Sequence, residues 1–141
     1  MQGYGTIKLI NMAKQFINEL KEGQAVDSKF SVKYKKPPRR YRNKKGSWFI
    51  VGLSDKTGEM ELRFWGKEDT ESVKRVYDSF REDNIIHVVG TSQANVYGNK
   101  IEIHVNEGEG RIEKTEDFDM EDFVPKTTQD IDKMFAEINN T

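Results

Sequence analysis

The sequence has no cysteine among its 141 residues, only three prolines and only two histidines. Without cysteine, disulfides, thiolate metal sites and a cysteine nucleophile are excluded. No segment approaches the run of about eighteen apolar residues that a membrane-spanning helix needs. The first 22 residues lack the continuous apolar region of a signal peptide. We therefore expect a single-domain cytoplasmic protein without a membrane segment.

Candidates for catalysis are few. His87 and His104 each fall within a predicted strand, and neither belongs to a spacing typical of a metal site or a catalytic triad. A structural or surface histidine is the commoner role in such positions. Carboxylates are abundant, but no constrained pair is visible. The sequence predicts no catalytic residue, no bound metal and no cofactor, so we do not expect an enzyme.

Charge is distributed unevenly, although the net charge is only −1. Residues 1–106 contain 19 basic and 13 acidic residues, whereas residues 107–141 contain 4 basic and 11 acidic residues. A basic surface attracts phosphate groups. The acidic tail could lie over that surface, recruit a basic partner, or simply be solvated.

A β-hairpin is predicted over residues 46–65, GSWFIVGLSDKTGEMELRFW. The apolar residues alternate along both halves, which places one set in the core and the other on an outer face. Asp55 and Gly58 supply the turn between the halves. The inward set is Phe49, Val51, Leu53, Met60, Leu62 and Phe64.

Three further strands and one helix are predicted around this hairpin. Strands are expected over residues 24–35, 85–91 and 100–106, and a helix over residues 68–80. The predicted core residues outside the hairpin are Val26, Phe30, Val32, Val73, Val76, Tyr77, Phe80, Ile101, Ile103 and Val105. The sequence thus predicts a mainly β protein in which a helix separates the third strand from the fourth.

The hairpin and its basic approach resemble strands two and three of OB-fold domains that bind single-stranded nucleic acid. The segments KEGQAVDSKFSVK, LSDKTGEMELRFW and DFVPKTTQDIDKMF are similar to the N-terminal OB domain of YhaM-type 3′-to-5′ exonucleases. SDKTGE is also shared with replication protein A-type OB domains and with anticodon-binding domains of some tRNA synthetases. The resemblance implies a five-stranded OB barrel, and binding without cleavage, because the YhaM-type nuclease site lies in a separate downstream domain.

We divide the chain into a lead-in over residues 1–22, an OB fold over residues 23–107 and an acidic C-terminal segment over residues 108–141. The lead-in is expected to be extended or a short helix beneath the barrel. The last segment includes a predicted amphipathic helix over residues 128–138. Its apolar face packs on the barrel, on a protein partner or on a second copy of the chain.

The predicted binding surface begins with a run of eight Lys or Arg and no acid over residues 33–45. Basic residues beside an aromatic suit single strands, in which phosphates alternate with unpaired bases. A solubilising loop is the alternative. Pro37 and Pro38 predict a stiff loop that leaves the strand.

Two aromatic positions follow from the resemblance to replication protein A-type domains, which place stacking aromatics where Trp65 and Tyr97 stand. Trp65 could instead face inward and pack against the helix, because a bulge would reverse its side. Together the predicted nucleic-acid-binding residues are Lys35, Lys36, Arg39, Arg40, Tyr41, Arg42, Lys44, Lys45, Trp48, Lys56, Arg63, Trp65 and Tyr97.

The function that we predict is binding of single-stranded DNA or RNA with low sequence specificity. An interaction subunit of a replication, repair or RNA-processing complex, and a tRNA-binding module, are the alternatives.

Overall fold

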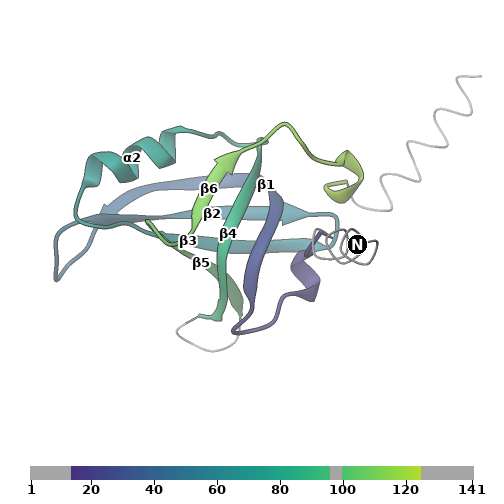
Figure 1. The fold of residues 1–141 in the computed structure, drawn as a ribbon, viewed down its shortest axis with the longest axis horizontal. Coiled ribbons are helices and arrows are strands. Elements are labelled where there is room, and N and C mark those ends of the chain that lie inside the picture. The colour runs from purple at the N-terminus through teal and green to yellow at the C-terminus, as the bar shows by residue number, and fades with distance from the viewer. Residues whose placement is uncertain (1–13, 96–99, 125–141) are drawn as a thin grey trace, which may run out of the picture.

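The computed structural model describes residues 14–95 and 100–124. In it, five strand pairings close a β-barrel (Figure 1). Strand β3 pairs with β5 in parallel, and the other pairings are antiparallel. In order along the chain, the elements are the 3-10 helix η1 (Ile17–Glu19), β1 (Ala25–Arg40), β2 (Ser47–Asp55), β3 (Gly58–Trp65), α2 (Thr70–Asp78), β4 (Ile85–Ala94), β5 (Ile101–Asn106), β6 (Arg111–Lys114) and the 3-10 helix η2 (Met120–Asp122).

One long strand closes the barrel. The first part of β1 pairs with β4, from Ala25 opposite Thr91 to Ser31 opposite Ile85. Beyond Ser31 the same strand turns to pair with β2 and reaches Arg40 opposite Ser47. The barrel order is therefore β1-β2-β3-β5-β4 and back to β1, which is the arrangement predicted for an OB fold.

The core is formed by the residues that the alternation pattern directs inward. Phe49 and Phe64 stack with ring centroids 4.9 Å apart. Of the predicted core residues, Met60, Val76, Tyr77 and Ile101 are half-buried; the others are buried: Val26, Phe30, Val32, Phe49, Val51, Leu53, Leu62, Phe64, Val73, Phe80, Ile103 and Val105. Burial of these apolar side chains is the main force that holds the barrel closed.

Helix α2 lies between β3 and β4, as predicted, and packs across one end of the barrel. It begins after Asp69, whose side chain accepts a hydrogen bond of 3.0 Å from the backbone N–H of Glu71. Val73 is its buried residue, and Phe80 enters the core just after the helix ends. The helix thus covers this end of the barrel core. It does not cover the outer face of β2 and β3.

The prediction that Pro37 and Pro38 interrupt the first strand is wrong. Strand β1 continues through both prolines to Arg40. The ladder with β2 shifts register between Lys36 and Arg39. A bulge of this kind needs no amide donor from the residues within it, so the two prolines are tolerated there.

A sixth strand, β6, is an element that the sequence analysis did not predict. It pairs antiparallel with β4 and buries Ile112. Its four residues lie beyond residue 107, at which we ended the OB fold. The alternation of polar and apolar residues in β6 is too short to indicate a strand in a segment that is so rich in charged residues.

The described part of the lead-in packs against the barrel, and η1 is the short helix that we expected there. Ile17 and Leu20 belong to the core. The backbone N–H of Ile17 donates to Asp55 Oδ2 at 2.9 Å, which ties η1 to the β2–β3 turn. On the C-terminal side, the backbone N–H of Lys56 donates to the carbonyl of Asp122, at 2.8 Å. The predicted helix over residues 128–138 lies outside the described residues. Within the described ranges, no helix is long and apolar enough to cross a membrane.

Candidate nucleic-acid interface

The outer face of the β2–β3 hairpin carries both tryptophans of the chain. Trp65 pairs with Trp48 across the ladder, and Trp48 in turn pairs with Arg39 of β1. Directly paired residues of antiparallel strands share one face. Phe64, the neighbour of Trp65, is buried in the core. Trp65 therefore faces outward, and the alternative of an inward Trp65 is excluded.

Three aromatic rings lie side by side at this end of the hairpin. The ring centroids of Trp48 and Trp65 are 5.4 Å apart, and those of Tyr41 and Trp65 are 6.3 Å apart. The planes of Tyr41 and Trp65 differ by only 17°. All three side chains are half-buried. Part of each ring therefore remains accessible to solvent.

The β1–β2 loop folds so that Tyr41 reaches Trp65. The Tyr41 hydroxyl donates to the Gly66 carbonyl at 2.9 Å, and its backbone N–H donates to the Gly46 carbonyl at 3.1 Å. Gly46 has a φ of +111°, and a Cβ there would lie 2.2 Å from the carbonyl oxygen of Lys67. Only glycine fits this position without strain.

Basic residues surround the three rings. Arg39, Arg40, Arg42 and Lys45 are exposed, and none of them forms an ion pair with another residue in the described part of the chain. Lys44 lies with its Nζ atom 4.4 Å from the centroid of Tyr41. We call this surface the aromatic–basic end; it comprises Arg39, Arg40, Tyr41, Arg42, Lys44, Lys45, Trp48 and Trp65.

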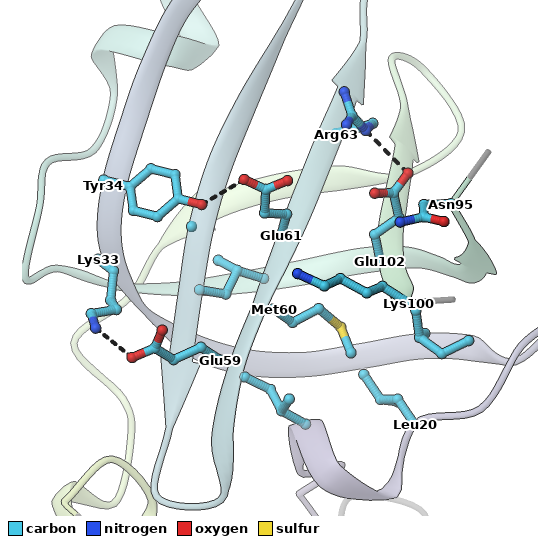
Figure 2. Close-up of a pocket in the computed structure, with 14 residues that line it drawn as sticks. Leu20, Lys33, Tyr34, Glu59, Met60, Glu61, Arg63, Asn95, Lys100 and Glu102 are labelled. Atoms are coloured by element: carbon cyan, nitrogen blue, oxygen red, sulfur yellow. Dashed lines mark hydrogen bonds and ion pairs between the residues drawn. The ribbon is translucent and has the colours of Figure 1, made fainter. Parts of the chain in front are cut away.

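The rest of the outer face is a groove in which most of the charged side chains are paired with one another. Its volume is about 770 Å³. Figure 2 shows Tyr34, Glu61, Arg63 and Glu102 converging on it from β1, β3 and β5. We call it the ion-paired groove; its paired polar residues are Lys33, Tyr34, Lys36, Glu59, Glu61, Arg63 and Glu102.

The pairs of the groove run from strand to strand. Lys33 forms an ion pair with Glu59, and Arg63 Nε lies 3.0 Å from Glu102 Oε1. The Tyr34 hydroxyl donates to Glu61 Oε2 at 2.6 Å. Burial and this bond raise the pKa of Tyr34 to about 12. Its three carboxylates make this part of the face much less attractive to phosphate than the aromatic–basic end.

The structure brings most of the predicted site residues to this one face, but two of the lysines lie elsewhere. Lys35 Nζ donates to the carbonyls of Tyr77 and Phe80, each at 2.6 Å. Burial at that position lowers its pKa. Lys56 lies in the β2–β3 turn, at the end of the hairpin opposite Trp65. Tyr97 lies outside the described residues.

Lys36 and Arg63 lie on the outer face, where each is paired with an acidic side chain. Lys36 Nζ is 3.8 Å from Glu61 Oε2. Arg63 forms its ion pair with Glu102 and also lies near Trp48, with the guanidinium carbon 5.6 Å from the ring centroid. Arg63 therefore links the ion-paired groove to the aromatic–basic end, whereas Lys36 contacts residues of the groove.

Several residues of this face were missing from the predicted site, among them Tyr34, Glu102 and His104. The Tyr34 ring lies over Gly52, where a Cβ would approach it to 2.2 Å. His104 accepts a hydrogen bond of 3.1 Å from Trp65 Nε1. The alternation of β5 could have placed Glu102 and His104 on the outer face, but the β3–β5 register that sets them beside Arg63 and Trp65 is not local. Within the described residues, no group of three or more ligating side chains could hold a metal ion.

A closed five-stranded barrel, with a helix after the third strand and aromatic and basic residues on the β2–β3 face, defines an OB-fold domain. The sequence agrees, because residues 32–109, more than half of the chain, match the family model tRNA_anti-codon, described as an OB-fold nucleic acid binding domain. The chain belongs to this family. No curated protein matches the sequence.

Solved structures of similar fold include a replication factor A related protein and two structures bound to ssDNA. A replication factor A related protein from Methanobacterium thermoautotrophicum is 24% identical with a TM-score of 0.58, over 74% of this chain and 93% of that one. Pot1pC from Schizosaccharomyces pombe, bound to ssDNA, is 12% identical with a TM-score of 0.57, over 77% and 91%.

A replication protein A heterotrimer bound to ssDNA contains a chain that is 23% identical, with a TM-score of 0.56 over 73% of this chain. The present chain spans only 25% of the length of that one. At these identities the likeness shows the fold. The resemblance to YhaM-type exonucleases stays a prediction.

Proposed function

We propose that this protein binds single-stranded DNA or RNA with low sequence specificity and performs no chemistry on it. The observation that carries the proposal is the Trp48–Trp65 pair at the aromatic–basic end, where Arg39, Arg40 and Arg42 form no ion pair among the described residues. Stacked rings offer unpaired bases a surface, and free guanidinium groups offer phosphates a counter-charge.

Low specificity follows from the kind of contact. Every base has a π face, so stacking on Trp48, Trp65 or Tyr41 tolerates any sequence, and each stacked base contributes about 1–3 kcal/mol. Contacts from Arg39, Arg40 and Arg42 to phosphates release counterions and do not read bases. A base within a duplex has its faces covered, so duplexes should bind poorly.

The solved relatives support the proposal in a general way. The Pot1pC and replication protein A structures of similar fold are bound to ssDNA. The chain's membership of a nucleic-acid-binding family also supports a function in nucleic-acid binding.

The test is fluorescence anisotropy of labelled poly-dT, poly-rU and a duplex of equal length, titrated with the protein at two salt concentrations. We expect both single strands to bind, the duplex to bind much more weakly, and affinity to fall as salt rises. Absence of single-strand binding at low salt would overturn the proposal. The basic residues would then be assigned to a protein partner, in line with an interaction subunit of a larger complex.

A tRNA-binding role is the second candidate, favoured by the family model that residues 32–109 match. Folded tRNA presents single-stranded loops to the same kind of aromatic and basic surface. Competition decides between the two roles. If unlabelled tRNA displaces poly-rU at concentrations well below those of a single-stranded competitor of equal nucleotide content, the tRNA role is the better one.

A further inference from the structure

A chain of side-chain hydrogen bonds connects Trp65 to a single carboxylate on β5. Trp65 Nε1 lies 3.1 Å from His104 Nδ1, and His104 Nε2 lies 2.8 Å from Glu102 Oε1. The side chains of His104 and Glu102 are only 16% and 9% exposed. Both side chains are therefore largely covered by their neighbours.

The chemistry of the donors fixes the direction of this chain. An indole N–H can only donate, so Nδ1 of His104 is the acceptor. The ring hydrogen then lies on Nε2 and is donated to Glu102. The carboxylate thus selects the tautomer of His104 that can hold Trp65.

The same carboxylate oxygen also holds the second tryptophan, through Arg63. Arg63 Nε donates to Glu102 Oε1 at 3.0 Å, and the guanidinium carbon lies 5.6 Å from the ring centroid of Trp48. Glu102 is therefore a common anchor for the groups that contact the two tryptophans. The β3–β5 pairing, with Arg63 opposite His104, sets this arrangement in the backbone.

We propose that Glu102 and His104 are positioning residues that hold the Trp48–Trp65 platform ready for stacking without touching the nucleic acid. A half-exposed tryptophan that samples several orientations must be ordered when a base binds, and that ordering weakens binding. A hydrogen bond made before binding removes this cost. The inference rests on the proposed function, because stacking on these rings is what the two residues would assist.

Two variants at residue 104 separate positioning from simple packing. In His104→Asn the amide oxygen lies near the place of Nδ1 and can still accept from Trp65. In His104→Gln the amide reaches the place of Nε2, so that it keeps the bond to Glu102 but leaves Trp65 without an acceptor. We expect His104→Asn to bind poly-dT almost as well as wild type, and His104→Gln to bind about 3- to 10-fold more weakly.

The free protein offers an independent readout, because Trp48 and Trp65 are the two tryptophans of the whole sequence. Their fluorescence therefore reports on the platform alone. We expect a shifted emission and faster acrylamide quenching in His104→Gln, and wild-type behaviour in His104→Asn. Equal behaviour of the two variants, in fluorescence or in binding, would overturn the proposal.

A third variant, Glu102→Gln, tests the common anchor without changing the shape of the side chain. It should alter the fluorescence of the free protein. At high salt, where the charge that Arg63 gains by losing its acidic partner is screened, it should also weaken binding of poly-dT. Wild-type fluorescence in Glu102→Gln would overturn its positioning role. The control is His87→Asn and His87→Gln on β4, where the histidine pairs with Asp27 and not with a tryptophan.

Failure of this inference can be told from failure of the proposed function. If the wild-type protein binds no single strand, the proposed function fails, while the fluorescence of the free variants still decides whether His104 holds Trp65. Circular dichroism and thermal melting establish that each variant is folded before it is scored. Should His104→Gln not fold, Glu102→Gln decides the question by the same fluorescence measurement.

Discussion

Trp48 and Trp65 are direct partners across the β2–β3 ladder, and their ring centroids lie 5.4 Å apart. The two rings are tilted by 32° to each other. Because they touch, the stacking surface is shared, and removal of one ring exposes the edge of the other. Their contributions to binding are therefore coupled and not independent.

Replacement of either tryptophan should weaken binding to single strands while the fold is kept. We expect Trp65→Leu and Trp48→Leu each to reduce affinity for poly-dT by about 1–3 kcal/mol, because one base can no longer stack. The slope of affinity against salt should not change, since the arginines still bind the phosphates. Anisotropy titrations at several salt concentrations measure both quantities. Wild-type affinity in both variants would exclude these rings from the site.

The arginines of the aromatic–basic end should determine the salt dependence. For Arg39, Arg40 and Arg42 changed together to Ala, we expect weaker binding and a shallower slope of log affinity against log salt. The slope should fall by about 0.7 for each phosphate that an arginine binds, or by about 2 in all. The matched control changes Lys21, Arg81 and Lys114 to Ala; these three are also exposed, and none of them belongs to the aromatic–basic end or lines the groove. If both triple variants had the same effect, the arginines would act only through the net charge of the protein and not through contacts with the phosphates.

The acids of the ion-paired groove should oppose binding. Glu59 pairs with Lys33, and Glu61 lies near Lys36. With Glu59→Gln and Glu61→Gln combined, both lysines lose their counter-charge, so we expect binding a few-fold tighter and a steeper salt dependence. Titration beside a control that changes Glu22 and Glu113 to Gln tests this. Weaker binding in the groove variant would mean that these carboxylates contact the ligand.

Much of the fold could be predicted from the sequence because its signals are local. Alternation in the hairpin places Phe49 and Phe64 inward, whereas the side on which Trp65 lies was left open and is set by the β2–β3 register. The helix after β3 is signalled by the spacing from Val73 to Phe80. What could not be predicted depends on non-local contacts: the pairing of β6 with β4, and the bulge that carries β1 through two prolines.

The candidate site could be predicted only in part, because its geometry also depends on non-local contacts. The basic run points to the arginines, and strand alternation and the resemblance to replication protein A-type domains point to the tryptophans, but none of these signals gives the partners that each side chain contacts in the fold. Lys35 belongs to the basic run in sequence, yet its ammonium binds the end of α2. In the sequence, His104 is an isolated histidine within a predicted strand. In the structure, the parallel β3–β5 register places it against Trp65.

The role of Lys35 in the fold can be tested separately from binding. Because its ammonium accounts for two carbonyls at the end of α2, Lys35→Met should lower the free energy of unfolding by about 1 kcal/mol. It should leave the salt slope of binding unchanged. Urea denaturation and anisotropy measure the two effects, with Lys36→Met as the control on the same strand. A shallower salt slope in Lys35→Met would restore Lys35 to the phosphate-binding residues.

The ion pair between Lys14 and the buried Asp55 should make stability depend on pH. Lys14 Nζ lies 3.4 Å from Asp55 Oδ2 and 3.9 Å from the ring centroid of Phe30. Burial opposes the charge more strongly than Asp55 favours it, so the pKa of Lys14 is lowered from 10.5 to about 8. Between these values the unfolded chain binds the proton and the folded chain does not. The free energy of unfolding should therefore rise with pH, by at most about 1.4 kcal/mol per pH unit.

Urea denaturation between about pH 8 and about pH 9.5 measures this rise, with Lys14→Met as the comparison. The upper limit avoids Tyr34, whose pKa is raised from 10.0 to about 12, so that its contribution to stability is lost as pH rises above 10. In Lys14→Met the rise should be smaller, because Lys14 then releases no proton on folding and only Lys35, whose pKa burial also lowers, still does so. Parallel pH profiles of the two proteins would show that Lys14 keeps an ordinary pKa, and that Asp55 compensates in full for its burial.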